Sequence, residues 1–141
     1  MKFDAEVQTR NSQFGVEVAN LLKILIEFRT WLDKNKKRNI RFMRTYKEKI
    51  EKKVGPSIRE FQERYQGREE GQTFAFDHLM KAFSCFCRPI TFMETELRPS
   101  VGMGVFLERW MLTKAAESYL KECCQEADRH IDALTESQDL L

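Results

Sequence analysis

The residues best suited to bind a metal or to act as nucleophiles are two histidines and four cysteines. His78 precedes Cys85 by seven residues, and Cys123 precedes His130 by the same interval. Two residues seven apart on a helix share a face but lie about 10 Å apart along its axis. One ion could therefore use at most one residue from each pair. The simpler interpretation is that these side chains and the two remaining cysteines pack as small residues in a core.

The sequence contains none of the common metal or catalytic motifs. A di-iron bundle requires a glutamate three residues before a ligating histidine, whereas Ala75 and Ala127 occupy those positions. Cys85 and Cys87 would diverge by about 200° on a helix, and the other two cysteines are adjacent, so the spacing of a zinc knuckle is missing. No cysteine has the recognisable base of a catalytic nucleophile. We therefore expect a non-enzymatic protein with no metal, no cofactor and no small-molecule substrate.

The composition is typical of a single helical domain. A chain of 141 residues, 42% of them apolar, can form a substantial core. Charged residues make up 33% of the chain, which exceeds the average of about 25%. Six glycines and three prolines are too few for a fold of many short strands and turns. We predict one domain over residues 1–141, with 1–10 and 135–141 frayed.

The N-terminal segment and the cysteines bear on the cellular compartment. Residues 1–6 lack the apolar core of a signal peptide, and the apolar runs are shorter than the roughly 18 residues of a membrane span. Free thiols are then the expected state of the cysteines. These features predict an intracellular protein, with the cytoplasm favoured over the nucleus. Secretion is the alternative if a signal peptide has been removed.

Apolar residues recur at intervals of three and four along most of the chain, which predicts amphipathic helices. The expected helices are 11–34, 40–65, 73–87, 91–98 and 105–134. The first could also begin near Phe3. Gly55–Pro56 should kink or break the second, and Pro89 should end the third. Four long helices with short connections predict an all-α, antiparallel four-helix-type bundle with a short extra helix between the third and the fourth.

Charge is strongly segregated along the chain. The net charge is −1 over residues 1–33, +9 over 34–68 and −6 over 69–141. A basic helix face could bind nucleic acid, another polyanion or an anionic membrane. It could also pair with the acidic last helix, or with an acidic protein partner. The candidate polyanion-binding residues are Lys36, Lys37, Arg38, Arg41, Arg44, Lys47, Lys52 and Lys53.

The leading functional hypothesis is a protein–protein interaction module, an adaptor or an assembly subunit. The first and third helices carry more apolar residues than the three in seven that a bundle helix requires. Surplus aromatic residues and methionines are typical of binding surfaces when they cluster. A partner's amphipathic helix or a second copy of the chain, forming a homodimer, would cover them. The candidate partner-binding residues are Trp31, Phe42, Phe92, Trp110 and Met111.

Overall fold

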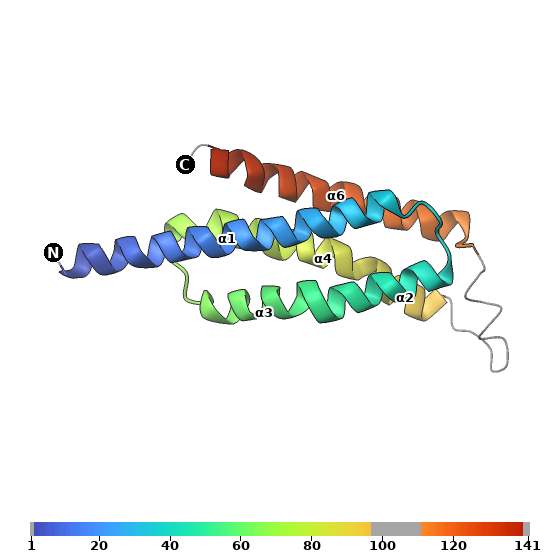
Figure 1. Ribbon diagram of the computed structural model, residues 1–141, viewed down its shortest axis with the longest axis horizontal. Helices are drawn as coiled ribbons and strands as arrows, with labels where there is room; N and C mark the ends of the chain where they lie inside the picture. Colours follow the sequence, from blue (N-terminus) through green and yellow to red (C-terminus); the bar gives the residue numbers. More distant parts are fainter. Residues whose placement is uncertain (1, 97–110, 140–141) are drawn as a thin grey trace.

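The computed structural model describes residues 2–96 and 111–139, and nearly all of them are helical. For residues 2–12, 95–96 and 138–139 it describes the backbone only. The predicted all-α antiparallel bundle is confirmed (Figure 1). Its elements are α1 (Lys2–Lys34), α2 (Ile40–Lys49), the π-helical turn η1 (Ile50–Val54), α3 (Gly55–Arg64), the 3₁₀ turn η2 (Glu70–Gln72), α4 (Thr73–Glu96) and α6 (Lys114–Asp139).

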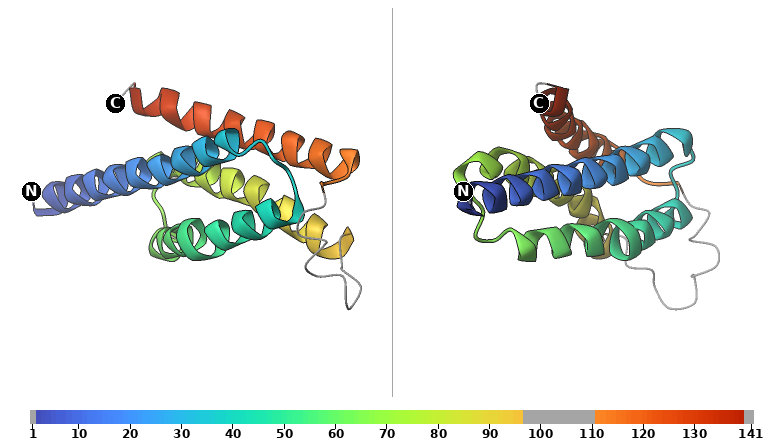
Figure 2. Two further views of the ribbon diagram at one scale, coloured as in Figure 1. Left: turned by 45° about the vertical axis from the view of Figure 1, so that its right-hand side comes forward. Right: turned by 60° about the vertical axis from the view of Figure 1, so that its left-hand side comes forward.

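The helices run up and down in alternation. In Figure 1, α1 leads away from the N-terminus, α2 and α3 return beneath it, α4 runs out behind, and α6 returns above. The described N- and C-terminal ends consequently lie at the same end of the bundle (Figure 2). The most extensive packing is between α4 and α6.

The first helix buries the stripe that its spacing predicts. It begins at Lys2, close to the alternative start near Phe3 rather than at residue 11. Residues 2–10 are thus part of α1, and α6 extends to Asp139. Seven apolar side chains of α1 are each 7% exposed or less: Phe14, Val18, Leu21, Leu22, Leu25, Phe28 and Leu32.

The second predicted helix is a kinked rod built from α2, η1 and α3. The kink is a π turn in which the Gly55 N–H donates to the carbonyl of Ile50, five residues earlier. A Cβ at position 55 would lie only 2.8 Å from that carbonyl oxygen, so glycine is the residue that fits. The wider turn also gives room to the ring of Pro56, which cannot donate a backbone hydrogen bond. The apolar stripe therefore continues across the kink, with Val54 and Ile58 both buried.

The prediction that Pro89 ends the third helix is wrong. A single helix, α4, continues through Pro89 to Glu96, so no separate helix begins near residue 91. Pro89 is among the most deeply buried side chains, and its packing offsets the roughly 3 kcal/mol that an internal proline costs. In the same region the Tyr46 hydroxyl donates to the Phe86 carbonyl at 2.6 Å. The carbonyl that loses its helical partner to Pro89 is that of Cys85, four residues earlier, and the Tyr46 bond falls on the next carbonyl in the same turn.

The last helix begins at Lys114, later than the predicted residue 105, and residues 105–110 lie outside the described part of the chain. Just before it, Met111 forms an antiparallel bridge with Asn39, and the Leu112 N–H donates to the Arg38 carbonyl at 2.9 Å. These contacts fasten the start of α6 to the α1–α2 connection. Of the helices described, none is both long enough and apolar enough to cross a membrane.

Candidate functional site

A groove lies between α1 and the rod formed by α2, η1 and α3. Its volume is about 270 Å³. Apolar side chains from both walls line it, and charged side chains from α1, α2 and η1 complete it. The lining residues are Ile24, Glu27, Phe28, Trp31, Lys49, Lys53 and Val54. An apolar groove with a few charged groups is the usual form of a site for an apolar ligand or a helix.

Aromatic stacking fixes the position of Trp31 in this groove. The indole stacks on the Phe42 ring, with centroids 5.1 Å apart and an interplanar angle of 2°. On its own helix it stacks against Phe28 at 5.8 Å. The Lys49 ammonium lies 5.1 Å from the indole centroid, a distance at which a cation is attracted to the ring face. Trp31 is only partly buried, so the groove presents a rigidly held aromatic surface.

A second hollow continues the groove toward the other end of α1. Its volume is about 160 Å³, and Ile24 lines both hollows. Leu21 and Phe61 contribute to this part, and an ion pair between Glu17 and Arg64 crosses its far end. From position 17 to position 31 of α1 the two hollows extend about 21 Å at 1.5 Å per residue. That length corresponds to about four helical turns.

The five predicted partner-binding residues are not brought together. Phe42 is 7% exposed, so the structure places it in the core and it is not available to a partner. Phe92 is partly buried and packs on Tyr119 of α6 with a centroid distance of 4.8 Å. Met111 is 58% exposed but lies beside the α1–α2 connection. Trp110 is outside the described residues. Of the four that the structure describes, Trp31 alone lines the groove.

Four large apolar side chains lie on the exterior of the described part of the chain. They are Val16, Ile26, Phe74 and Met111, with exposures from 42% to 61%. None of them lines either hollow of the groove. The apolar surplus that the sequence predicts is therefore mostly internal.

Arg38, one of the candidate polyanion-binding residues, lies at the boundary of the core rather than on an exposed basic helix face. One of its guanidinium nitrogens, Nη2, donates to the Leu32 carbonyl at 3.0 Å. The guanidinium also covers the ring of Phe42 at 4.4 Å. Burial, partly opposed by the charge of Cys124, lowers the pKa of this group. Arg38 therefore supports the packing of the α1–α2 connection.

Two of the remaining cations of residues 34–53 form ion pairs with neighbouring carboxylates, and most of these cations are exposed. Lys47 lies 2.5 Å from Glu94 of α4, and Lys52 lies 2.8 Å from Glu48 within the same helical rod. The exposed positive side chains on this segment are Lys34, Lys36, Lys37, Arg41, Arg44, Lys52 and Lys53. Lys47 therefore pairs with α4 and Lys52 with its own rod, rather than with the acidic last helix.

Acidic residues of α6 instead pair with α1 and α4. Arg29 of α1 donates to both carboxylate oxygens of Asp128, through Nε at 2.8 Å and Nη2 at 3.0 Å. Burial lowers the pKa of Arg29, but the hydrogen bond and charge of Asp128 outweigh it, so the net pKa is raised. Arg88 of α4 donates to Glu126 at 2.8 Å. These pairs hold α6 against its two neighbours.

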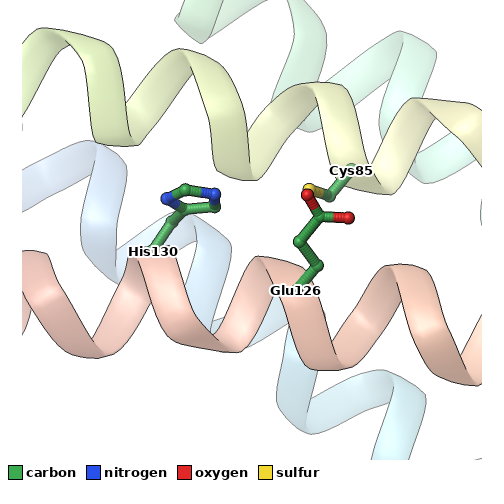
Figure 3. A group of neighbouring side chains, drawn as sticks. All are labelled: Cys85, Glu126 and His130. Carbon is green, nitrogen blue, oxygen red and sulfur yellow. The ribbon is translucent and has the colours of Figure 1, made fainter.

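A cluster of potential metal ligands lies between α4 and α6. Cys85 comes from α4, and Glu126 and His130 come from α6, four residues apart on one face (Figure 3). One ligand atom from each lies within 4.8 Å of the others. His78 of α4 adds a hydrogen bond between its Nδ1 and the Nδ1 of His130 at 2.9 Å. The spacing of seven relates the histidines to the cysteines but does not point to Glu126, although the spacing of four between Glu126 and His130 is a usable signal.

The four cysteines are free thiols, three of them buried and Cys87 partly buried. Burial raises the pKa of the Cys87 and Cys124 thiols to about 11. Burial also raises the pKa of Cys85 and Cys123, and for Cys85 the negative charge of Glu126 acts in the same direction. An activated nucleophile requires the opposite shift, toward the thiolate.

Comparison with known proteins gave no relatives: no protein-family model matches the chain, and no curated protein and no solved structure matches it significantly. The groove, the basic segment and the cysteine–histidine–glutamate cluster are therefore the features of the molecule that bear on its function.

Proposed function

We propose that the protein is an interaction module whose groove between α1 and the α2–η1–α3 rod accepts an amphipathic helix of a partner protein. The observation that carries this proposal is the position of Trp31. Its indole is held by stacking on Phe42, is only partly buried, and lies in an apolar groove. A fixed tryptophan in an apolar depression is the kind of residue on which binding energy concentrates.

The dimensions of the groove favour a helix as its occupant. About 21 Å of length accommodates roughly 14 helical residues. Such a helix would place apolar side chains at intervals of three and four toward Ile24, Trp31 and Phe61. A single partner helix would thus contact both hollows.

The charges along the groove favour acidic residues on one flank of the partner helix. Lys49 and Lys53 stand beside Trp31, with Glu27 as the acidic group of the same hollow. Lys53 is exposed and makes no ion pair within the described residues. Complementary carboxylates on the partner would mainly speed association and set the direction in which the partner helix lies in the groove. Their contribution to affinity would be smaller.

The test is a selection of amphipathic helical peptides against the immobilised protein, followed by binding titrations with purified variants. We expect enriched peptides to carry apolar residues three and four apart and Asp or Glu on one flank. Ile24→Glu, in the groove floor, should weaken peptide binding at least tenfold. Ile26→Glu is the matched control, because Ile26 is on the same helix, is 42% exposed and does not line the groove.

Two outcomes would contradict the proposal. One is a selection that enriches no helical pattern. The other is equal binding by the Ile24→Glu and Ile26→Glu variants when urea unfolding shows both to be folded. Lys49→Glu combined with Lys53→Glu should slow association and reduce its salt dependence.

A second copy of the chain is the other protein partner to be tested. Self-association through the groove predicts a native mass of two chains that falls to one chain in the Ile24→Glu variant. A single-chain mass for the unmodified protein at both low and high salt would exclude self-association, and the proposed partner of the groove would then be a different protein.

Polyanion binding is the second candidate function, and one observation favours it. Lys36, Lys37 and Arg41 are exposed, and in the described part of the chain they form no ion pair. Reversing all three to Glu should abolish binding to a labelled oligonucleotide or to anionic vesicles, and binding by the unmodified chain should fall steeply with salt. Comparing the two probes separates nucleic acid from membrane. Unchanged binding after the triple reversal would refute this function.

A further inference from the structure

The strongest unassigned feature is the side-chain cluster between α4 and α6. Cys85 is buried, while Glu126 and His130 are half-buried. Their ligand atoms lie within 4.8 Å of one another, so the two helices already hold three donors around one point. Figure 3 shows the Cys85 sulfur next to the Glu126 carboxylate, with the His130 ring facing them from one turn along α6.

We propose that Cys85, Glu126 and His130 bind one divalent transition-metal ion of the zinc class. A thiolate, an imidazole nitrogen and a carboxylate oxygen are the three donor types that zinc takes from proteins. With bond lengths of roughly 2.0–2.3 Å, tetrahedral ligands lie roughly 3.5 Å apart. The three donors would need to approach by about 1 Å, which small side-chain rotations provide. The proposal is independent of the function of the groove.

The bond between the two histidines orients the imidazole for this role. The Nδ1 of His130 is engaged with the Nδ1 of His78 at 2.9 Å, which leaves Nε2 as the nitrogen for the ion. A ligating histidine in a protein usually donates its other ring N–H to a neighbouring acceptor, and this bond fixes the ring. The ring of Phe74 contacts His78 edge-on with a centroid distance of 4.4 Å, so the orienting histidine is itself held.

The charges at the site balance those of a divalent ion. Binding would release the thiol proton of Cys85 to solvent, so that one thiolate and one carboxylate neutralise the two positive charges. Arg88 occupies Oε2 of Glu126 at 2.8 Å, and Oε1 remains as the ligand atom. Three protein ligands leave a fourth position, which water would fill. The ion would join α4 to α6 where these two helices pack together.

The experiment is a titration of cobalt(II) into the full chain after chelator treatment, under a non-thiol reductant. We expect one cobalt per chain, a sulfur-to-cobalt charge-transfer band in the near ultraviolet, and visible bands of tetrahedral intensity. Zinc should displace cobalt and bleach these bands. Added zinc should also raise the melting temperature, because it binds the folded chain.

Variants separate the proposed ligands from their neighbours. Cys85→Ser should remove the charge-transfer band, and Glu126→Gln should weaken cobalt affinity at least tenfold. Cys87→Ser is the matched control on the same helix and should leave both unchanged. His78→Gln should keep the band but lower the affinity about 10- to 100-fold, as expected for a residue that positions a ligand.

Three results would overturn the proposal. The first is the absence of a charge-transfer band at saturating cobalt. The second is a band that persists in Cys85→Ser or disappears in Cys87→Ser. The third is an unchanged cobalt affinity in Glu126→Gln. This variant is the decisive test if Cys85→Ser does not fold, because the Glu126 carboxylate is half-exposed and its loss spares the core.

Discussion

Replacing Tyr46 by phenylalanine tests how α4 tolerates a proline in its interior. Tyr46 is 0% exposed, and its hydroxyl donates to the Phe86 carbonyl at 2.6 Å. Phenylalanine keeps the ring against Phe28, whose centroid lies 5.0 Å away, and removes only the donor. The carbonyl would then be buried in the turn that Pro89 weakens, with one hydrogen bond fewer.

The expected cost is about 1–2 kcal/mol, because a buried acceptor that loses its partner is not compensated by water. For a chain of this length, the melting temperature should fall by about 3–7 °C. Burial also raises the pKa of the Tyr46 hydroxyl, so the group is a neutral donor over the whole neutral range. The measurement is urea unfolding at pH 7, monitored by circular dichroism.

Tyr65→Phe is the matched control. The Tyr65 ring is half-buried and packs edge-on against Phe14 at 5.0 Å, while its hydroxyl forms no hydrogen bond to the described residues. Its removal should change stability by less than about 0.5 kcal/mol. If Tyr46→Phe loses no more than this control, the Phe86 carbonyl is satisfied within its own helix, and the Tyr46 hydroxyl does not compensate for Pro89.

Three further perturbations test other parts of the fold. Gly55→Ala should destabilise the fold by about 1–3 kcal/mol in urea unfolding, since the new Cβ would lie 2.8 Å from a backbone oxygen. The control is Gly15→Ala, where a Cβ would have nothing within 4 Å and should raise the stability by up to about 1 kcal/mol. Equal effects of the two substitutions would exclude the clash. The Cys124 thiol has a pKa of about 11 in the folded chain against 9.0 unfolded. Its contribution is therefore complete below pH 9 and is lost as pH rises through 11, and Cys124→Ala should reduce this alkaline loss by roughly 2–3 kcal/mol; a variant with the unmodified pH dependence would contradict the assignment. A double-mutant cycle of Arg29→Met with Asp128→Asn should give a coupling of about 1 kcal/mol that shrinks in 1 M salt, and additive effects would show that the pair contributes nothing.

The sequence was sufficient to predict the fold class and the first helix's core. Phe14 and Leu32 mark the ends of a stripe whose spacing of three and four is directly visible, and all of it is buried. Such a pattern depends on local geometry alone, so it survives into the structure. The kink at Gly55 was predictable for the same reason, since proline imposes a local constraint.

The errors arose where tertiary packing outweighed a local signal. The local rule predicts that Pro89 ends a helix, but α4 continues through it, with the proline ring buried and the Tyr46 hydroxyl bonded to the nearby Phe86 carbonyl. The surplus of apolar residues predicts that Phe42 lies on a partner surface, because a single bundle offers little room for it. In the structure Trp31 and Arg38 enclose it from two sides.

The candidate sites depend on juxtapositions that spacing within one helix cannot supply. Lys49 and Trp31 meet only because α2 folds back along α1. Cys85 and His130 approach only at the register in which α4 and α6 pack. Sequence spacing restricts a metal ion to one residue of each cysteine–histidine pair, and which members meet is decided by that register.

The π turn at residues 50–54 has a consequence for how the chain can change in length. A π turn holds one residue more than an α turn without adding another turn to the helix. Deleting one exposed residue there, such as Lys52, would convert it to a regular turn and leave the flanking segments in phase, at the cost of the room that the wider turn gives to Pro56. The same deletion in α1 would rotate everything beyond it by about 100°. The rod formed by α2, η1 and α3 is therefore a part of the chain that could lose one residue while the apolar stripes on either side of the kink stay aligned.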